Sequence, residues 1–221
     1  MTHTVHPYAH RLGIIKDWKS RWFSADPKQY REFIKCDTTI REFLVKRLRG
    51  FYVSSIEFER SASSLRVIIK TSRPGLIIGR SGEGAVKLKA EVAKVLNKLK
   101  LNEVPNIKID IEEVRSPESN AAIVGAMVAE GLEKRFPFRR ILKQTAEKVY
   151  ANRDVKGVRI ALSGRLGGAE MSRREQLKKG RIPLQTFRAD IYFAREKAYL
   201  PYGVIGIKVW IYKGDIFEDK K

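Results

Sequence analysis

Alternating apolar and polar positions predict three strands in the first half of the chain. From Phe51 to Arg60 the alternation changes phase at Ser54-Ser55, which is typical of a strand with a β-bulge. Residues 65–70 and 107–112 carry isoleucine, leucine or valine at every second position. A strand of this kind buries one face and leaves the other in water. We therefore expect a sheet with one apolar face.

Helical periodicity predicts two helices that would cover this sheet. Asp26-Pro27 suits the N-cap and first turn of a helix, whose pattern continues to about residue 48 with a possible break near Asp37-Thr38. Within 88–99 the apolar residues recur at i, i+4, i+7, i+8 and i+11, which places them on one helical face. The order helix, strand, strand, helix, strand predicts an α/β sandwich over residues 26–116.

More helices and strands are predicted beyond a boundary at Ser116-Pro117. Serine can cap a helix and proline can open one, and Pro137 would separate two helices, over 118–135 and from there to about 152. Strand patterns follow near 157–163, 183–193 and 203–213. The expected fold class is thus α+β, with the following parts: a basic, aromatic N-terminal extension (1–25), an α/β domain (26–116), a second α/β domain with two helices packed on a mainly antiparallel sheet (117–214), and a short polar tail (215–221).

The charge of the chain indicates a polyanionic partner. Its 221 residues include 45 Lys and Arg against 25 Asp and Glu, a formal net charge of +20, while 43% of residues are hydrophobic. A folded chain with this excess favours nucleic acid, and an anionic membrane surface is the second candidate. The longest apolar stretch, Ala121–Ala129, is far shorter than the roughly 20 residues that a membrane-spanning helix needs. A single cysteine, Cys36, suits a reducing compartment, and we interpret it as an inert core residue.

The basic excess is concentrated in residues 134–188, which hold 16 basic and 4 acidic residues. The helix predicted after Pro137 would bury one side and present Arg139, Arg140 and Lys143 on the other. These three cations could hold a strand of phosphates. The alternative is an ordinary solvated helix face.

A G-x-x-G turn, Gly79-Arg80-Ser81-Gly82, precedes the helix pattern of residues 88–99. Glycines let a nucleic-acid backbone approach the main chain, and the following helix directs free N–H groups at a phosphate. A P-loop is excluded because Gly84 is followed by Ala85 and not by lysine, and a dinucleotide fingerprint is excluded because Lys87 occupies its last glycine position. A tight turn without a ligand remains the alternative.

A second element combines glycines and cations between Ser163 and Arg181. It could bring backbone and guanidinium groups to a sugar-phosphate edge, although a bulge or hairpin turn with incidental arginines would look the same. The histidines His3, His6 and His10 lack the partners of a recognisable metal site and could instead contact RNA. The carboxylates Asp110, Glu112 and Glu113 are interpreted as the wet face and end of a strand, not as catalytic acids.

Five segments together resemble one known family. They are Val5-His6-Pro7 with residues 11–14, then 73–83, 138–140, 163–170 and 202–211. The chain resembles, nearly end to end, the bacterial or organellar family of the third protein of the small ribosomal subunit. This resemblance implies a type II KH domain followed by a family-specific α/β domain, bound to ribosomal RNA in the head of the subunit beside the tenth and fourteenth small-subunit proteins.

The resemblance further implies that Arg139, Arg140 and Lys143 line the channel by which messenger RNA enters and help to part its duplexes. It implies a cytoplasmic, ribosomal location and no enzymatic activity, cofactor, metal or small-molecule substrate. We expect ribosomal RNA to contact the following residues: His6, Arg11, Gly79, Arg80, Ser81, Gly82, Arg165, Gly167, Gly168, Arg173, Arg174, Lys178 and Lys179. Two alternatives are a free-standing KH regulator of messenger or small RNA, and a nucleic-acid processing enzyme, for which the sequence offers no nucleophile or metal cluster.

Overall fold

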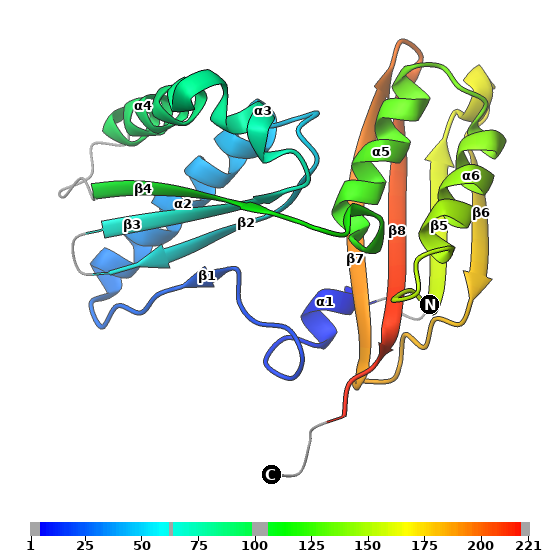
Figure 1. The fold of residues 1–221 in the computed structure, drawn as a ribbon, viewed down its shortest axis with the longest axis horizontal. Helices are drawn as coiled ribbons and strands as arrows, with labels where there is room; N and C mark the ends of the chain where they lie inside the picture. The colour runs from blue at the N-terminus through cyan, green and yellow to red at the C-terminus, as the bar shows by residue number, and fades with distance from the viewer. Residues whose placement is uncertain (1–4, 62–63, 99–105, 218–221) are drawn as a thin grey trace. The chain divides into compact units, whose positions relative to one another are not determined.

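The computed structural model describes residues 5–61, 64–98 and 106–217, which form two compact units (Figure 1). One unit is made by the described residues of Trp18–Arg115. The other combines those of Met1–Asp17 with those of Ser116–Lys221. The N-terminal extension expected from the sequence is therefore shared between the two units.

The Trp18–Arg115 unit is a four-stranded sheet with two long helices. Its elements are β1 (Ser20–Arg21), α2 (Pro27–Arg47), β2 (Val53–Arg60), β3 (Ser64–Thr71), α3 (Pro74–Ile78), the 3-10 turn η1 (Arg80–Gly82), α4 (Glu83–Lys98) and β4 (Asn106–Glu113). The strand order is β1-β2-β3-β4, with β2 antiparallel to β3 and the other neighbours parallel. Buried residues of α2 and α4 share one core with alternate residues of the strands, as the periodicity predicts.

Local details of this unit confirm several predictions and correct one. The register of β2 shifts between Val53 and Ser55, which is the expected bulge. Asp26 caps α2 by accepting a hydrogen bond from the Lys28 amide at 3.0 Å. The possible break near Asp37 is absent, because the buried Asp37 carboxylate is satisfied by tertiary partners and α2 runs on to Arg47.

The outer face of this sheet is a network of ion pairs. Arg66 pairs with Asp110 and with Glu59, and Lys70 lies 3.0 Å from Glu57. This arrangement confirms the interpretation of Asp110 as part of a wet strand face, because the carboxylates neutralise cations on neighbouring strands.

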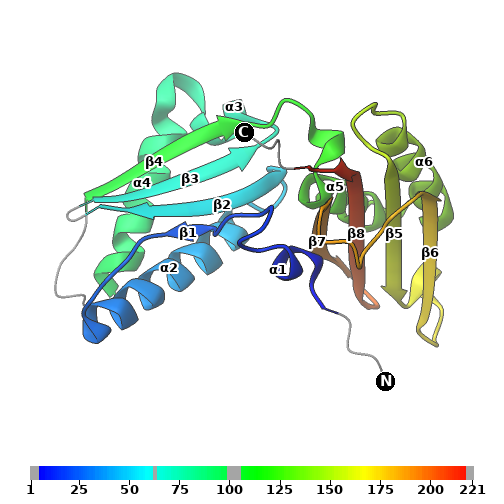
Figure 2. The ribbon, with the colours of Figure 1, turned by 90° about the horizontal axis from the view of Figure 1, so that it is seen from below.

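The second unit packs two helices on one side of an antiparallel sheet. Its elements are α1 (Pro7–His10), η2 (Pro117–Ser119), α5 (Ala121–Glu133), α6 (Phe138–Tyr150), β5 (Gly157–Gly164), η3 (Leu166–Gly168), β6 (Arg173–Gly180), β7 (Ala189–Leu200) and β8 (Gly203–Asp215). The strand order is β6-β5-β8-β7, and every neighbouring pair is antiparallel. Figure 2 shows α5 and α6 on the same side of this sheet, where their apolar residues form the core with β5 and β8.

Three predictions for this unit need correction. The sequence pattern predicts three strands, but β6 is a fourth, whose eight residues include a single apolar side chain, Leu177, because it lies at the sheet edge. The strand expected at 183–193 is β7 and begins at Ala189, after a loop that contains Pro183. The helix expected from residue 118 begins at Ala121, because the Asn120 side chain caps it by accepting a hydrogen bond from Ala122.

Candidate nucleic-acid interface

The G-x-x-G turn joins two helices that approach very closely. The backbone has φ of +72° at Gly79, +53° at Ser81 and +81° at Gly82, all in the left-handed region. At Gly84 a Cβ atom would lie 2.4 Å from the carbonyl oxygen of Ile77, so only glycine lets the start of α4 pack against α3. The turn is therefore held in one shape by its neighbours.

This turn presents its charge to solvent. Arg80 and Ser81 are exposed, as the phosphate-binding interpretation requires, and α4 continues for 16 residues behind them. Glu83 opens α4 and stands 3.4 Å from Lys87. The Glu83 carboxylate stabilises the positive end of the helix dipole and partly offsets its attraction for a phosphate.

Helix α6 presents the three predicted cations as expected. Ile141, Leu142, Ala146 and Val149 are buried in the core, whereas Arg139, Arg140 and Lys143 are exposed. The helix is thus held by its apolar side while its cations face outward, which confirms the arrangement predicted from its periodicity.

A contact between α6 and β6 braces part of this cationic surface. The guanidinium groups of Arg139 and Arg173 lie 5.6 and 5.3 Å from the centre of the Phe138 ring. Both also approach Glu175, at 3.4 and 3.6 Å. The Glu175 carboxylate therefore holds Arg139 of α6 and Arg173 of β6 side by side. These two cations are far apart in sequence.

The β6 strand divides the four predicted cations between two faces of the sheet. Residues alternate in direction along a strand, and Leu177 packs against the helix-covered core. Arg173 and Lys179 therefore lie on the helix side, where Lys179 is 3.6 Å from Glu147. Arg174 and Lys178 project from the opposite side and are exposed.

Arg165 uses part of its guanidinium to brace its own loop. It donates to the carbonyl oxygens of Ala169 at 2.9 Å and Tyr202 at 3.3 Å. The loop turns at Gly167 and Gly168, whose φ values are +70° and +81°. The side chain remains exposed, so the element presents both bare backbone and a cation at the surface.

The prediction that Arg11 contacts RNA at the surface is wrong, because Arg11 lies in the interior. Its side chain is 0% exposed, and its guanidinium donates to the carbonyl oxygens of Ala189 (2.6 Å), Thr186 (2.8 Å) and Leu184 (3.0 Å). Burial lowers the pKa of Arg11, and the nearby Asp190 carboxylate opposes that change. A buried guanidinium with these partners cannot reach a phosphate. We therefore no longer include Arg11 among the residues proposed to bind RNA.

His6 also takes part in the fold. Its Nδ1 accepts a hydrogen bond from the Tyr8 amide at 3.2 Å and so caps α1. The His6 ring meets Phe193 edge to face, with 4.7 Å between ring centres. RNA contact by His6 stays a prediction. His3 lies outside the described residues, and His10 stacks on Phe187.

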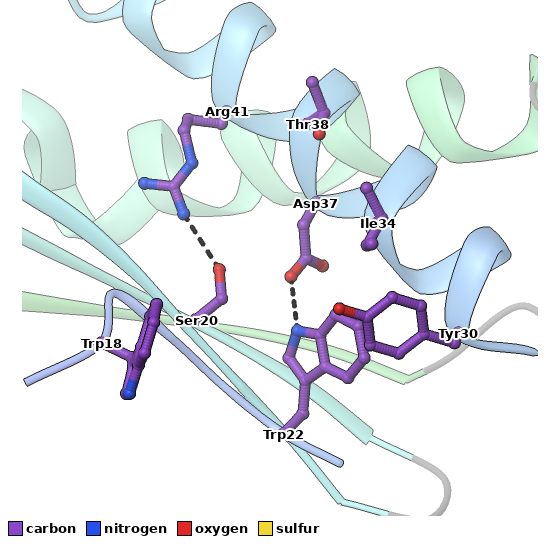
Figure 3. A pocket seen from close by; sticks show the side chains of 8 residues that line it. All are labelled: Trp18, Ser20, Trp22, Tyr30, Ile34, Asp37, Thr38 and Arg41. Atoms are coloured by element: carbon purple, nitrogen blue, oxygen red, sulfur yellow. Dashed lines mark hydrogen bonds between the residues drawn. The ribbon is translucent and has the colours of Figure 1, made fainter. Parts of the chain in front are cut away.

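A pocket in the Trp18–Arg115 unit lies beside the exposed aromatic side chains of Trp18 and Tyr30 (Figure 3). It has a volume of about 290 Å³ and lies between α2 and the segment around Trp18 and Trp22. Asp37 points into it but accepts from Trp22 at 2.8 Å and pairs with Arg60 at 2.6 Å. Because the Asp37 carboxylate already binds Trp22 and Arg60, we interpret it as a structural group that holds the Trp22 segment to α2, and not as an acid or base.

Metal ligands and reactive thiols are the last features of the described ranges to consider. No cluster of three or more His, Cys, Asp or Glu side chains there could hold a metal ion. Cys36 is buried and its pKa is raised, mainly by desolvation, which disfavours the reactive thiolate. Within the same ranges, no helix is both long and apolar enough to span a bilayer.

Comparisons with known proteins assign both units to families. Residues 39–119 match the family described as KH domain, and residues 128–211 match the family described as ribosomal protein S3, C-terminal domain. The chain is similar to the small ribosomal subunit protein uS3 of Caldicellulosiruptor saccharolyticus, with 43% identity over 100% of this chain and 96% of that protein. It is also similar to the proteins of that name from Nitrosococcus oceani, with 42% identity over 99% and 94%, and Clostridium novyi, with 42% identity over 100% and 96%.

Proposed function

The chain belongs to the uS3 family of small-subunit ribosomal proteins, and from this premise we propose that it lines the channel by which messenger RNA enters the subunit. The family establishes the broader role: a structural, RNA-binding component of the small ribosomal subunit, and not an enzyme. It also confirms the α+β fold class with an N-terminal KH domain. The finer proposal adds a seat in the head of the subunit, beside the tenth and fourteenth small-subunit proteins.

The observation that carries the channel proposal is the outward face of α6. Arg139, Arg140 and Lys143 project from a helix whose other side is locked in the core. The helix backbone thus holds the three cations at fixed spacing. Because they are already in position, less conformational entropy is lost when they bind a strand of phosphates. Arg173 extends this row through the shared contact with Glu175.

The same chemistry limits what α6 can do to a messenger duplex. Cations grip phosphates regardless of sequence and stabilise separated strands. The sequence has no P-loop, so the chain supplies no energy from nucleotide hydrolysis. Strand separation is therefore driven by ribosome translocation, and the role of α6 is to hold the strands that translocation has parted.

The remaining predicted residues form the proposed ribosomal RNA surface. In the KH unit, which we place at 26–116, the exposed turn offers a cation and open backbone. In the second unit, placed at 117–214, η3 and β6 offer the rest. The proposed set is Gly79, Arg80, Ser81, Gly82, Arg165, Gly167, Gly168, Arg173, Arg174, Lys178 and Lys179, together with His6.

The test replaces the α6 cations in reconstituted subunits. A variant with Arg139→Ala, Arg140→Ala and Lys143→Ala is compared with a control that carries Lys134→Ala, Arg153→Ala and Lys156→Ala, which removes the same charge from exposed positions of the same unit outside α6. We expect both to assemble and to translate an unstructured messenger at the normal rate. The α6 variant alone should slow on a messenger with a stable downstream hairpin.

Two results would contradict the proposal. Normal speed of the α6 variant on the hairpin messenger would show that these cations do not hold parted strands. An equal slowing by the control variant would show that net charge, and not the face of α6, sets the rate.

A further inference from the structure

The side of the C-terminal sheet that α5 and α6 leave uncovered carries a second group of cations. Core residues of β5 and β8, such as Ile160 and Val209, point toward the helices. Their sequence neighbours therefore point the other way, because side chains alternate along a strand. Part of this side is covered, because α1 packs on β7 and Ala161, Ile191, Trp210 and Tyr212 form a small buried cluster there. We call the remaining part, which carries the cations, the open face. Its cations are Arg159, Arg174, Lys178, Arg195, Lys197 and Lys208.

Carboxylates do not neutralise these cations. Five of the six are exposed and Arg159 is half-buried, and none forms an ion pair within the part of the chain that the structure describes. The helix side of the same sheet differs, since Arg173 and Lys179 there pair with Glu175 and Glu147. Among the described residues, the cations of the open face thus lack the ion-pair partners that the cations of the helix side have.

The strand register sets like charges directly against one another. Lys178 lies opposite Arg159 on β5, and Arg195 lies opposite Lys208 on β8. Like charges in such cross-strand pairs destabilise a sheet. A bound polyanion would offset this repulsion, because each of its negative charges would attract both cations of a pair.

Aromatic residues hold two of the arginines in place. The Arg159 guanidinium lies 4.8 Å from the centre of the Trp210 ring and donates to the Gln176 side-chain oxygen at 2.6 Å. Arg195 lies 5.5 Å from the Phe193 ring centre. Trp210 is only 8% exposed, so its ring supports the cation and is not open for base stacking.

From these observations we infer that the open face binds an RNA backbone as a second, sequence-independent contact surface. This inference rests on the proposed RNA-binding function and extends it to Arg159, Arg195, Lys197 and Lys208. Neighbouring strands lie about 4.8 Å apart, so four strands present cations across about 14 Å. A phosphate backbone suits a surface of that width, because it carries a negative charge at every nucleotide. An acidic protein would instead need a separate carboxylate placed opposite each cation.

The test uses only cations that are new to the RNA-binding surface. The open-face variant carries Arg195→Gln, Lys197→Gln and Lys208→Gln. Its matched control carries Lys28→Gln, Lys35→Gln and Lys46→Gln, which removes three exposed cations from the segment of α2. The probe is a transcript of the head domain of small-subunit ribosomal RNA, bound by the full chain over a range of salt concentrations.

We expect the open-face variant to lower the slope of log affinity against log salt by about 2 to 3, because each lost phosphate contact removes about 0.7 to 0.9. The control should change the slope by less than one contact. The melting temperature of the open-face variant should equal or exceed that of the unmodified chain, since the Arg195–Lys208 repulsion is gone. This measurement verifies that the variant is folded.

The outcomes separate this inference from the proposed function. If the unmodified chain shows no salt-dependent affinity for the transcript, the proposed function itself fails. If the unmodified chain binds and the open-face variant keeps the full slope, the inference alone is overturned. A full slope with defective subunit assembly would assign the open face to an acidic protein neighbour, which also overturns it.

Discussion

Replacing Arg11 tests whether a buried cation holds the N-terminal segment to the C-terminal sheet. The Arg11 guanidinium donates to three carbonyl oxygens between Leu184 and Ala189 at distances of 3.0 Å or less, and it also donates to Pro7 at 3.1 Å. Arg11→Ala removes all of these donors, and the Thr186 carbonyl oxygen then keeps the 3.3 Å hydrogen bond from the Ala189 amide. Arg11→Lys keeps the charge but replaces a planar fork by a single ammonium.

The magnitude follows from the number of strong bonds. A hydrogen bond that involves a charged group contributes about 1.5 kcal/mol, so the loss of three such bonds predicts a destabilisation of about 4.5 kcal/mol for Arg11→Ala. Arg11→Lys should lose about half as much, because one ammonium reaches fewer of the same acceptors. The control Arg153→Ala, at an exposed position of the same unit, should change the free energy by less than about 0.5 kcal/mol.

Hydrogen exchange measured segment by segment is the appropriate assay, because it reports on the strands of each compact unit separately. The free energy of opening should fall in β7 and β8 and stay unchanged in β2 and β3. At a temperature where Arg11→Ala remains folded, its RNA-binding salt slope should equal that of the unmodified chain. A loss below about 0.5 kcal/mol would refute the argument for a buried anchor. A reduced salt slope would restore Arg11 to the RNA surface.

Three further predictions concern the Trp18–Arg115 unit. Asp37→Ala leaves the buried charge of Arg60 without its carboxylate partner and should lower the free energy of unfolding, measured in urea, by about 3 to 5 kcal/mol. Gly84→Ala should lower the melting temperature and weaken RNA binding, since the added methyl would clash with the Ile77 carbonyl oxygen. Because burial raises the pKa of Cys36, its thiolate population at pH 7 to 9 is reduced, and a thiol reagent should react with it faster in urea than in the native chain.

Each of these predictions has its own check. Asp26→Ala, which removes an exposed helix cap, should cost only about 1 kcal/mol, and an equal cost for Asp37→Ala would argue against the buried pair. Gly75→Ala places its methyl in open space and serves as the control for Gly84. Equal rates of Cys36 modification in native and unfolded chain would contradict its burial.

Several features were accessible from sequence because they depend on neighbours within a few residues. The bulge at Ser54-Ser55 disturbs a period of two, and the exposed cations of α6 follow a period of 3.6, so both can be located by counting. The G-x-x-G turn was recognisable from its glycines and the helix that follows. Strand β6 could not be predicted in this way, because an edge strand with one apolar residue shows no clear alternation of apolar and polar positions.

By itself, the sequence determined the two α/β units, their long helices and a basic surface suited to RNA, since periodicity and composition are properties of local chain segments. Only the tertiary structure decided which cations belong to that surface. Arg11 is interior because its acceptors come from a loop more than 170 residues away. The open face exists because four strands align Arg159, Lys178, Arg195 and Lys208 in register. Burial and register depend on residues distant along the chain, and no local pattern encodes them.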